Sequence, residues 1–296
     1  MAVVPGNLDL VAASRPSRER NAVAIYVRRH PTVAIGGGLL VLMLAMAIFA
    51  PWLGTVDPTA LAPAHRLRWP SAEYWFGSDM LGRDIYSRTI YGARVSLIVG
   101  LSVALLATGL GLAIGLVTGF NRWIDAVIMR VMDGLMAIPG ILIAIALMAL
   151  TRASMGNVIF AITVAEVPRV TRLVRSVVLT LRDQPFVEAA IASGTSQIRV
   201  LWRHIVPNTL ATLLVQGTYI CASAMITEAI LSFLGAGTPP IIPSWGNIMA
   251  EGRAVFLVAY YIVLFPGIFL SLTVLAINLL GDGLRDAIDP RLARRL

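Results

Sequence analysis

Runs of about twenty apolar residues recur along this chain of 296 residues and limit its possible folds more than any other feature. A helix of about 20 residues crosses a hydrocarbon core of roughly 30 Å. Only 14% of the residues are charged, whereas about 25% are charged in a typical soluble domain. The pattern therefore predicts an all-α polytopic membrane protein.

Six of these runs are long enough to cross a membrane. The first run starts too far from the N-terminus for a signal peptide and has no cleavage signature, so we interpret it as an uncleaved first helix. Six crossings place both termini on one side. The runs lie at about residues 32–53, 95–118, 126–150, 158–179, 210–233 and 255–280.

The net charge of +8 indicates membrane topology rather than nucleic-acid binding, because the arginines flank the apolar runs and the chain contains no lysine. The two tails and the loops on their side carry twice as many arginines as the three opposite loops. The first outer loop, at 54–94, weakens this contrast with five arginines of its own. The positive-inside rule predicts that both termini are cytoplasmic.

The loop at 180–207, between the fourth and fifth runs, is much longer than a connection requires. Pro185 and Glu188 suit the first turn of a helix, and Gly194 suits its end. A second short helix is expected to follow, with its apolar residues on one face. These residues are Ile198, Leu201, Trp202 and Ile205. On the residues alone, such a loop could rest on lipid headgroups, pack under its own bundle or dock on a partner.

The spacing within this loop resembles the "EAA…G…P" cytoplasmic loop of ABC importer permeases. The matching residues are Glu188, Ala189, Ala190, Gly194 and Pro207. The resemblance implies a coupling loop that docks on a separate ATPase subunit. His204 and Val206 stand where isoleucine and leucine are usual in that family. A histidine at this position resembles the sequences of the peptide branch of the family.

Further blocks resemble the C-type membrane subunit of oligopeptide, dipeptide and nickel importers. They are "YWFGSDMLGRDIYSRTIYGARVSL", "RWIDAVIMRVMDGLMAIPG", "EAILSFLGAG" and "PSWGNIMAEGR". The resemblance implies a type-1 ABC importer fold of the MetI-like kind with six transmembrane helices. It divides the chain into a cytoplasmic tail (1–31), a first helix with an outer loop (32–94), a permease core (95–281) and a C-terminal cytoplasmic tail (282–296).

The same resemblance implies the partners and the cargo. The partners are a second, B-type permease, two ABC ATPase subunits and an extracytoplasmic solute-binding protein, all acting at the cytoplasmic membrane. Peptides are the favoured substrate, while peptide conjugates and nickel stay open. The chain itself is not expected to be an enzyme.

A cluster of glycines and charges precedes the second run. Gly77 and Gly82, with Asp79, Arg83 and Asp84, predict a tightly folded outer loop with internal ion pairs. Direct contact with substrate is the alternative interpretation of these residues.

Three carboxylates, Asp133, Glu166 and Glu228, fall inside or near apolar runs, where ionisable groups are costly. Arg130 and Arg169 lie one helical turn from the first two, so local pairing is expected. Glu228 is expected to reach water near the outer end of its run. The competing function is a secondary transporter or channel that uses these carboxylates.

Arginines recur every third residue in the fourth run, at 169, 172 and 175, which resembles a voltage-sensor ladder. We favour snorkelling at the cytoplasmic end of the run. Prolines at 139, 168 and 266 are expected to permit kinks.

Motifs for chemistry are missing from the sequence. It has no GxxxxGK[ST], HExxH or GxSxG pattern, and its single cysteine, Cys221, cannot form an internal disulfide. The histidines at 30, 65 and 204 are too far apart to suggest a metal site. We expect no catalytic residue, cofactor or metal.

Overall fold

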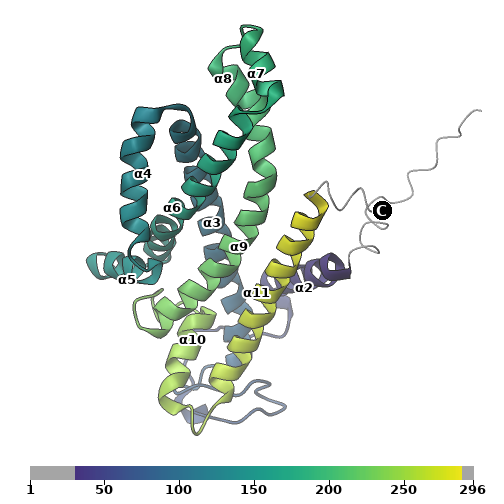
Figure 1. Ribbon diagram of the computed structural model, residues 1–296. Coiled ribbons are helices and arrows are strands. Elements are labelled where there is room, and N and C mark those ends of the chain that lie inside the picture. The colour runs from purple at the N-terminus through teal and green to yellow at the C-terminus, as the bar shows by residue number, and fades with distance from the viewer. Residues whose placement is uncertain (1–30, 289–296) are drawn as a thin grey trace, which may run out of the picture.

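The computed structural model describes residues 31–288, and within this range it consists of helices joined by loops, without a β-strand (Figure 1). Of the expected tails at 1–31 and 282–296, residues 1–30 and 289–296 lie outside the described residues, and residues 282–288 continue the last helix. The α-helices are α2 (Pro31–Ile48), α3 (Ile85–Phe120), α4 (Arg122–Met136), α5 (Gly140–Leu150), α6 (Met155–Arg182), α7 (Pro185–Ala192), α8 (Gln197–Val200), α9 (Val206–Phe233), α10 (Trp245–Gly252) and α11 (Tyr261–Ile288). A π-helix, η3 (Leu201–Ile205), lies between α8 and α9. Three short 3₁₀ helices complete the set: η1 (Ala50–Trp52), η2 (Pro63–His65) and η4 (Arg253–Val255).

Four segments within the described range are long and apolar enough to cross a membrane. They are α2, α3, the continuous segment Gln197–Phe233 and Tyr261–Asp286 of α11. Helices α4 and α5 together add a fifth candidate if they form one crossing. Helix α6 has 28 residues, but it contains Glu166 and four arginines. The expected total of six crossings stays a prediction.

The run at 126–150 is two helices rather than one. Helices α4 and α5 meet at an angle of 90°. Pro139 stands just before α5, and a proline both lacks an N–H and disfavours a helical conformation at the preceding residue. In contrast, Pro168 and Pro266 lie inside continuous helices.

Helices α3 and α6 pack closely through glycines spaced one turn apart. A Cβ atom added to Gly111 or Gly119 would lie 2.5 Å from a valine side chain of α6, and one added to Gly115 would lie 2.6 Å away. The facing residues are Val170, Val174 and Val178. Small residues at this spacing let the two backbones approach in a bilayer. This contact forms the centre of the bundle.

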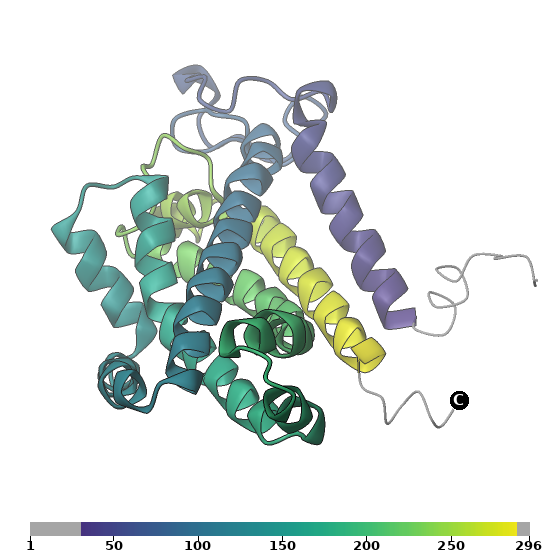
Figure 2. The same ribbon diagram turned by 90° about the horizontal axis from the view of Figure 1, so that it is seen from above.

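The remaining helices surround this centre. Viewed from above, α2 lies beside α11 on one side of the bundle, and α4 and α5 lie on the other (Figure 2). Helices α7 and α8 project at one end, while α10 and the outer loop lie at the opposite end (Figure 1). The loop with the EAA spacing and the glycine-rich outer loop therefore occupy opposite ends of the molecule.

Candidate functional site

The projecting end, which we call the tip (residues 183–207), turns a sharp corner at Gly194. Its φ is +80°, in the left-handed region that costs other residues about 1–2 kcal/mol. The Gly194 N–H donates to the Ile191 carbonyl at 2.9 Å, and the Thr195 N–H donates to the Ala190 carbonyl at 3.1 Å. These two bonds form a Schellman motif that closes α7. A Cβ atom added to Gly194 would meet no other atom within 4 Å, so the glycine is required by conformation rather than by space.

Helix α7 begins at Pro185, where the missing N–H costs nothing. Glu188 is exposed in its first turn, favourably placed for the helix dipole. Val187 is fully buried and anchors the helix. Ala189 is exposed, and its carbonyl accepts a hydrogen bond from the Ser193 hydroxyl at 2.8 Å.

The second arm of the tip contains a π-helix, which the sequence did not predict. The Val206 N–H donates to the Leu201 carbonyl, five residues earlier. The next residue, Pro207, has no N–H to continue the ladder. The Asn208 side-chain amide instead donates to the His204 carbonyl at 2.6 Å. The wider turn therefore accommodates Pro207 at the start of α9.

The π-helix also changes which side chains are exposed. Ile198 and Trp202 are 72% and 65% exposed, whereas Ile205 is fully buried and Leu201 is half-buried. The expected single apolar face is therefore wrong, because the wider turn alters the angular spacing of these residues. Phe186 and Ile191 of α7 are also exposed. Four large apolar side chains thus face outward within one short segment, as at protein interaction sites.

At the opposite end, a buried ion network joins the outer loop to α10. Arg83 Nε and an Arg88 terminal nitrogen each lie 2.6 Å from Asp79 Oδ2. Both arginines also pair with Glu251. Asp79 and Arg88 are each only 1% exposed. Sequence reasoning missed Arg88 and Glu251, because their contact depends on the packing of distant segments.

The other residues of the outer-loop motif fix the backbone. Gly77 and Gly82 have φ of +80° and +78°, and a side chain on Gly82 would collide with the Ala62 carbonyl. Asp84 forms no ion pair within the described range. It caps α3 instead, accepting the Ser87 N–H at 2.8 Å.

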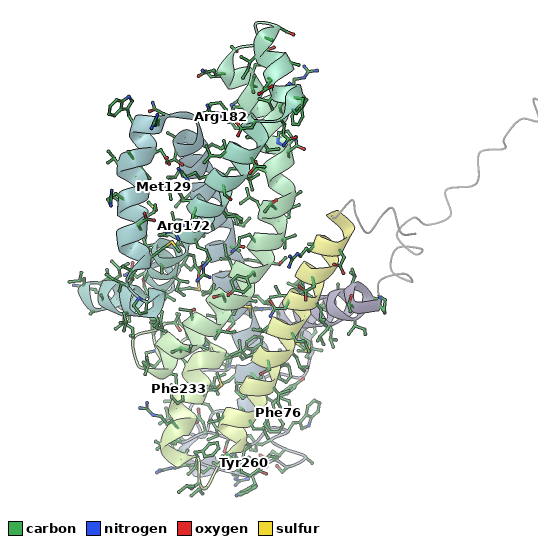
Figure 3. All side chains as sticks on the ribbon, viewed as in Figure 1. Phe76, Met129, Arg172, Arg182, Phe233 and Tyr260 are labelled. Atoms are coloured by element: carbon green, nitrogen blue, oxygen red, sulfur yellow. The ribbon has the colours of Figure 1, made fainter. Side chains whose placement is uncertain are left out.

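The loop is also anchored to α11. The Tyr261 hydroxyl donates to the Arg68 carbonyl at 2.9 Å. Phe76 stacks on Phe265 with ring centroids 4.0 Å apart. Figure 3 shows Phe76 and Tyr260 at this end of the bundle.

The carboxylates of α4 have partners on another helix. Asp133 of α4 lies 2.5 Å from Arg172 of α6, so the expected pairing with Arg130 is wrong. Asp125 of α4 makes two contacts with Arg175, at 2.5 and 2.6 Å. The expected pairing within one helix is thus replaced by a pairing between helices. Two of the three arginines of the ladder, Arg172 and Arg175, are paired with carboxylates of α4.

The other two carboxylates differ from each other. Glu166 lies 3.4 Å from Arg169, the local pairing expected from the sequence. Glu228 is fully buried, so the expectation that it reaches water is wrong. It accepts the Ser232 hydroxyl at 2.9 Å and has no ion pair among residues 31–288. Within the same range, no three His, Cys, Asp or Glu side chains gather as metal ligands.

These features define a multi-pass α-helical membrane protein with a glycine-cornered tip at one end of its bundle. Residues 107–294 match the family described as binding-protein-dependent transport system inner membrane component. Residues 23–70 match the N-terminal TM domain of oligopeptide transport permease C. The chain belongs to the family of binding-protein-dependent transport inner membrane components.

Relatives match along nearly the full length. A probable peptide ABC transporter permease of Sinorhizobium fredii is 53% identical, covering 96% of this chain and 97% of that protein. A dipeptide transport system permease of Alkalihalophilus pseudofirmus is 41% identical, covering 90% of this chain and 88% of that protein. A glutathione transport system permease of Pectobacterium atrosepticum is 41% identical, covering 90% and 89%.

A solved structure supports the fold independently. The MetNI methionine ABC transporter, in inward facing conformations, aligns with a TM-score of 0.54 at 18% identity. The alignment covers 68% of this chain and 96% of that chain. The MetI-like fold of the helical core is thereby established.

Proposed function

We propose that this chain is the C-type permease subunit of an ATP-driven importer that moves di- or oligopeptides across the cytoplasmic membrane. Family membership and the functions named for the relatives support this assignment. The main observation in support of this assignment is the structure of the tip. There, the segment with the EAA spacing forms a sharp corner and exposes apolar side chains.

The tip is proposed to dock on an ABC ATPase subunit, with Glu188, Ala189, Ala190, Gly194 and Pro207 as its framework. A small apolar surface with a rigid corner suits a groove on a partner. The two termini would then be cytoplasmic, like the tip. The other partners are a B-type permease beside this subunit, a second ATPase and a solute-binding protein at the outer end. ATP hydrolysis takes place in the ATPase subunits.

The connections of the tip suggest how motion passes into the membrane. Only Asp183 and Gln184 separate α6 from α7, and η3 runs directly into α9. A displacement of the tip would therefore act on α6 and α9 together. Helix α6 forms the close glycine contact with α3, so the core would move as a unit and alternate between two states.

A secondary transporter or channel is the competing function. It would use Asp133, Glu166 or Glu228 as coupling sites. Interhelical pairing of Asp133 and local pairing of Glu166 favour structural roles for these two carboxylates. Uptake that persists after removal of the ATPase subunits would support the competing function instead.

The proposal is tested by cross-linking in the assembled importer. A cysteine at Glu188 should cross-link to a cysteine placed in the groove of the ATPase subunit, because the tip would lie within it. A cysteine at Trp123, which is 86% exposed on α4, is the matched control and should cross-link much less. If the Glu188 position never forms this cross-link, either at rest or during ATP turnover, the docking role is wrong.

A further inference from the structure

Three arginines repeat along α6, and only two of them are held by α4. Arg172 and Arg175 approach carboxylates of α4 to 2.5 Å. Arg169 has only the longer contact of 3.4 Å with Glu166 on its own helix. Half of its side chain is exposed on the single subunit. Its guanidinium therefore retains donors for another group.

Through Tyr219, Arg169 contacts the rim of a small, mainly apolar pocket between α9 and α11 that carries a few hydroxyl and amide groups. Its guanidinium carbon lies 5.8 Å from the centroid of the Tyr219 ring. The pocket has a volume of about 150 Å³. It is lined by Tyr219, Ala222, Ser223, Ile226, Thr227 and Asn278. Hydroxyl and amide groups beside an arginine can bind a carboxylate and the adjacent peptide group.

Arg169 and Tyr219 lie at a depth in the membrane where substrate sites are expected. Arg169 is near the middle of the 28 residues of α6, and Tyr219 is near the middle of α9. An arginine that faced hydrocarbon at that depth would be costly, so it must face either a water-filled path or an acid of a partner. Substrate sites of transporters commonly lie near the bilayer midplane.

We infer that Arg169 binds the C-terminal carboxylate of a peptide during its passage, with Glu166 holding the guanidinium in place. This inference rests on the proposed function. The pocket is far smaller than the roughly 300–1,000 Å³ of a site for a whole ligand, so it takes one end of the peptide. The Thr227 hydroxyl donates to the Ser223 carbonyl at 2.9 Å, so its oxygen can accept the last peptide N–H. The Asn278 amide is a further hydrogen-bond partner for that peptide group.

The test compares two forms of one peptide in the complete importer, reconstituted with its binding protein and ATPases in lipid vesicles. The probes are trialanine and trialanine C-terminal amide, and initial uptake rates are measured for each. Arg169→Gln should lower uptake of the free acid by about 10-fold to 100-fold, the range for losing a hydrogen bond to a charged group. Uptake of the amide should change little. Arg169→Lys should restore most of the free-acid uptake.

The variant does not alter the binding protein, so a changed ratio between the two probes originates in the permease. Arg122→Gln is the matched control, because Arg122 is exposed at the start of α4, away from the pocket, and it should leave both rates unchanged. An equal loss for both probes in Arg169→Gln would overturn the inference, as would reduced assembly with the second permease, which would assign Arg169 to that interface. If the unaltered importer transports neither probe nor any other peptide tested, the proposed function itself fails.

Discussion

Arg88 at the start of α3 and Glu251 at the end of α10 form a two-point ion pair, with distances of 2.6 and 3.1 Å. They lie 163 residues apart in the chain. Asp79 approaches the same Arg88 guanidinium at 2.6 Å. The outer loop, α3 and α10 are thereby joined into one unit at this end of the bundle.

Removing Glu251 should destabilise the subunit, because the buried arginines Arg83 and Arg88 would then have only Asp79 to balance their two charges. Breaking a buried pair typically costs about 3–5 kcal/mol, and the remaining Asp79 places Glu251→Ala near the lower end. The measurement is the midpoint of thermal unfolding of the purified subunit in detergent. The matched control is Glu73→Ala, whose exposed pair with Arg68 is worth about 1 kcal/mol or less. Equal shifts for the two variants would contradict a structural role for the network.

Replacing Gly194 with valine should separate ATP hydrolysis from uptake. The left-handed conformation at this corner is strained for any side chain and most of all for a β-branched one. We expect normal amounts of the subunit in the membrane, continuing ATPase activity and at least a tenfold fall in peptide uptake, the size of a change of about 1.4 kcal/mol. Gly109→Ala is the control, since Gly109 lies inside a helix with no atom within 4 Å of an added Cβ. Unchanged uptake in Gly194→Val would show that the corner is not needed for coupling.

A larger side chain at the contact between α3 and α6 should destabilise the subunit. Gly115→Ala places a Cβ 2.6 Å from Val174, so the helices must separate. We expect a loss of about 1–3 kcal/mol of stability, as for overpacked cores. Adding Val174→Gly, which removes both the Cβ at 2.6 Å and the Cγ1 at 2.7 Å, should recover part of it, since the two residues are in contact and their effects are not additive. The check is thermal unfolding of both single variants and the double variant, and additive losses would exclude a direct clash.

Local signals in the sequence predict much of the tip, but not its second arm. Pro185 and Gly194 act through their own backbone preferences, so residue type alone indicates the start and the end of α7. The π-helix before Pro207 cannot be predicted in this way. It changes the angle between successive side chains around the helix axis, whereas a regular helical pattern assumes that this angle is constant. A regular pattern therefore places Ile205 on the wrong side.

Ionic partners are the least predictable feature, since they depend on how helices meet. Arg130 lies within reach of Asp133 along one helix, but Arg172 on the neighbouring helix binds it instead. Arg88 and Glu251 belong to separate sequence blocks, and only the packing of α10 against α3 brings them together. The burial of Glu228 has a related cause: α10 packs against α9 and covers the C-terminal end of that helix.

Neutralising Asp133 tests whether the chain works as an ATP-driven permease or as a transporter coupled to ions. Asp133 and Arg172 are each about half exposed, at 55% and 50% of their side chains, so their pair should contribute about 1 kcal/mol or less. Peptide uptake by Asp133→Asn should therefore stay within about twofold of the unaltered importer. This uptake should require ATP and should not change when a protonophore is added.

Asp125→Asn is the informative comparison, because the Asp125 carboxylate is 19% exposed and contacts Arg175 at two points. It should lower the unfolding midpoint more than Asp133→Asn does. Loss of uptake in Asp133→Asn at a normal membrane level, together with sensitivity to the protonophore, would instead place ion coupling at this carboxylate.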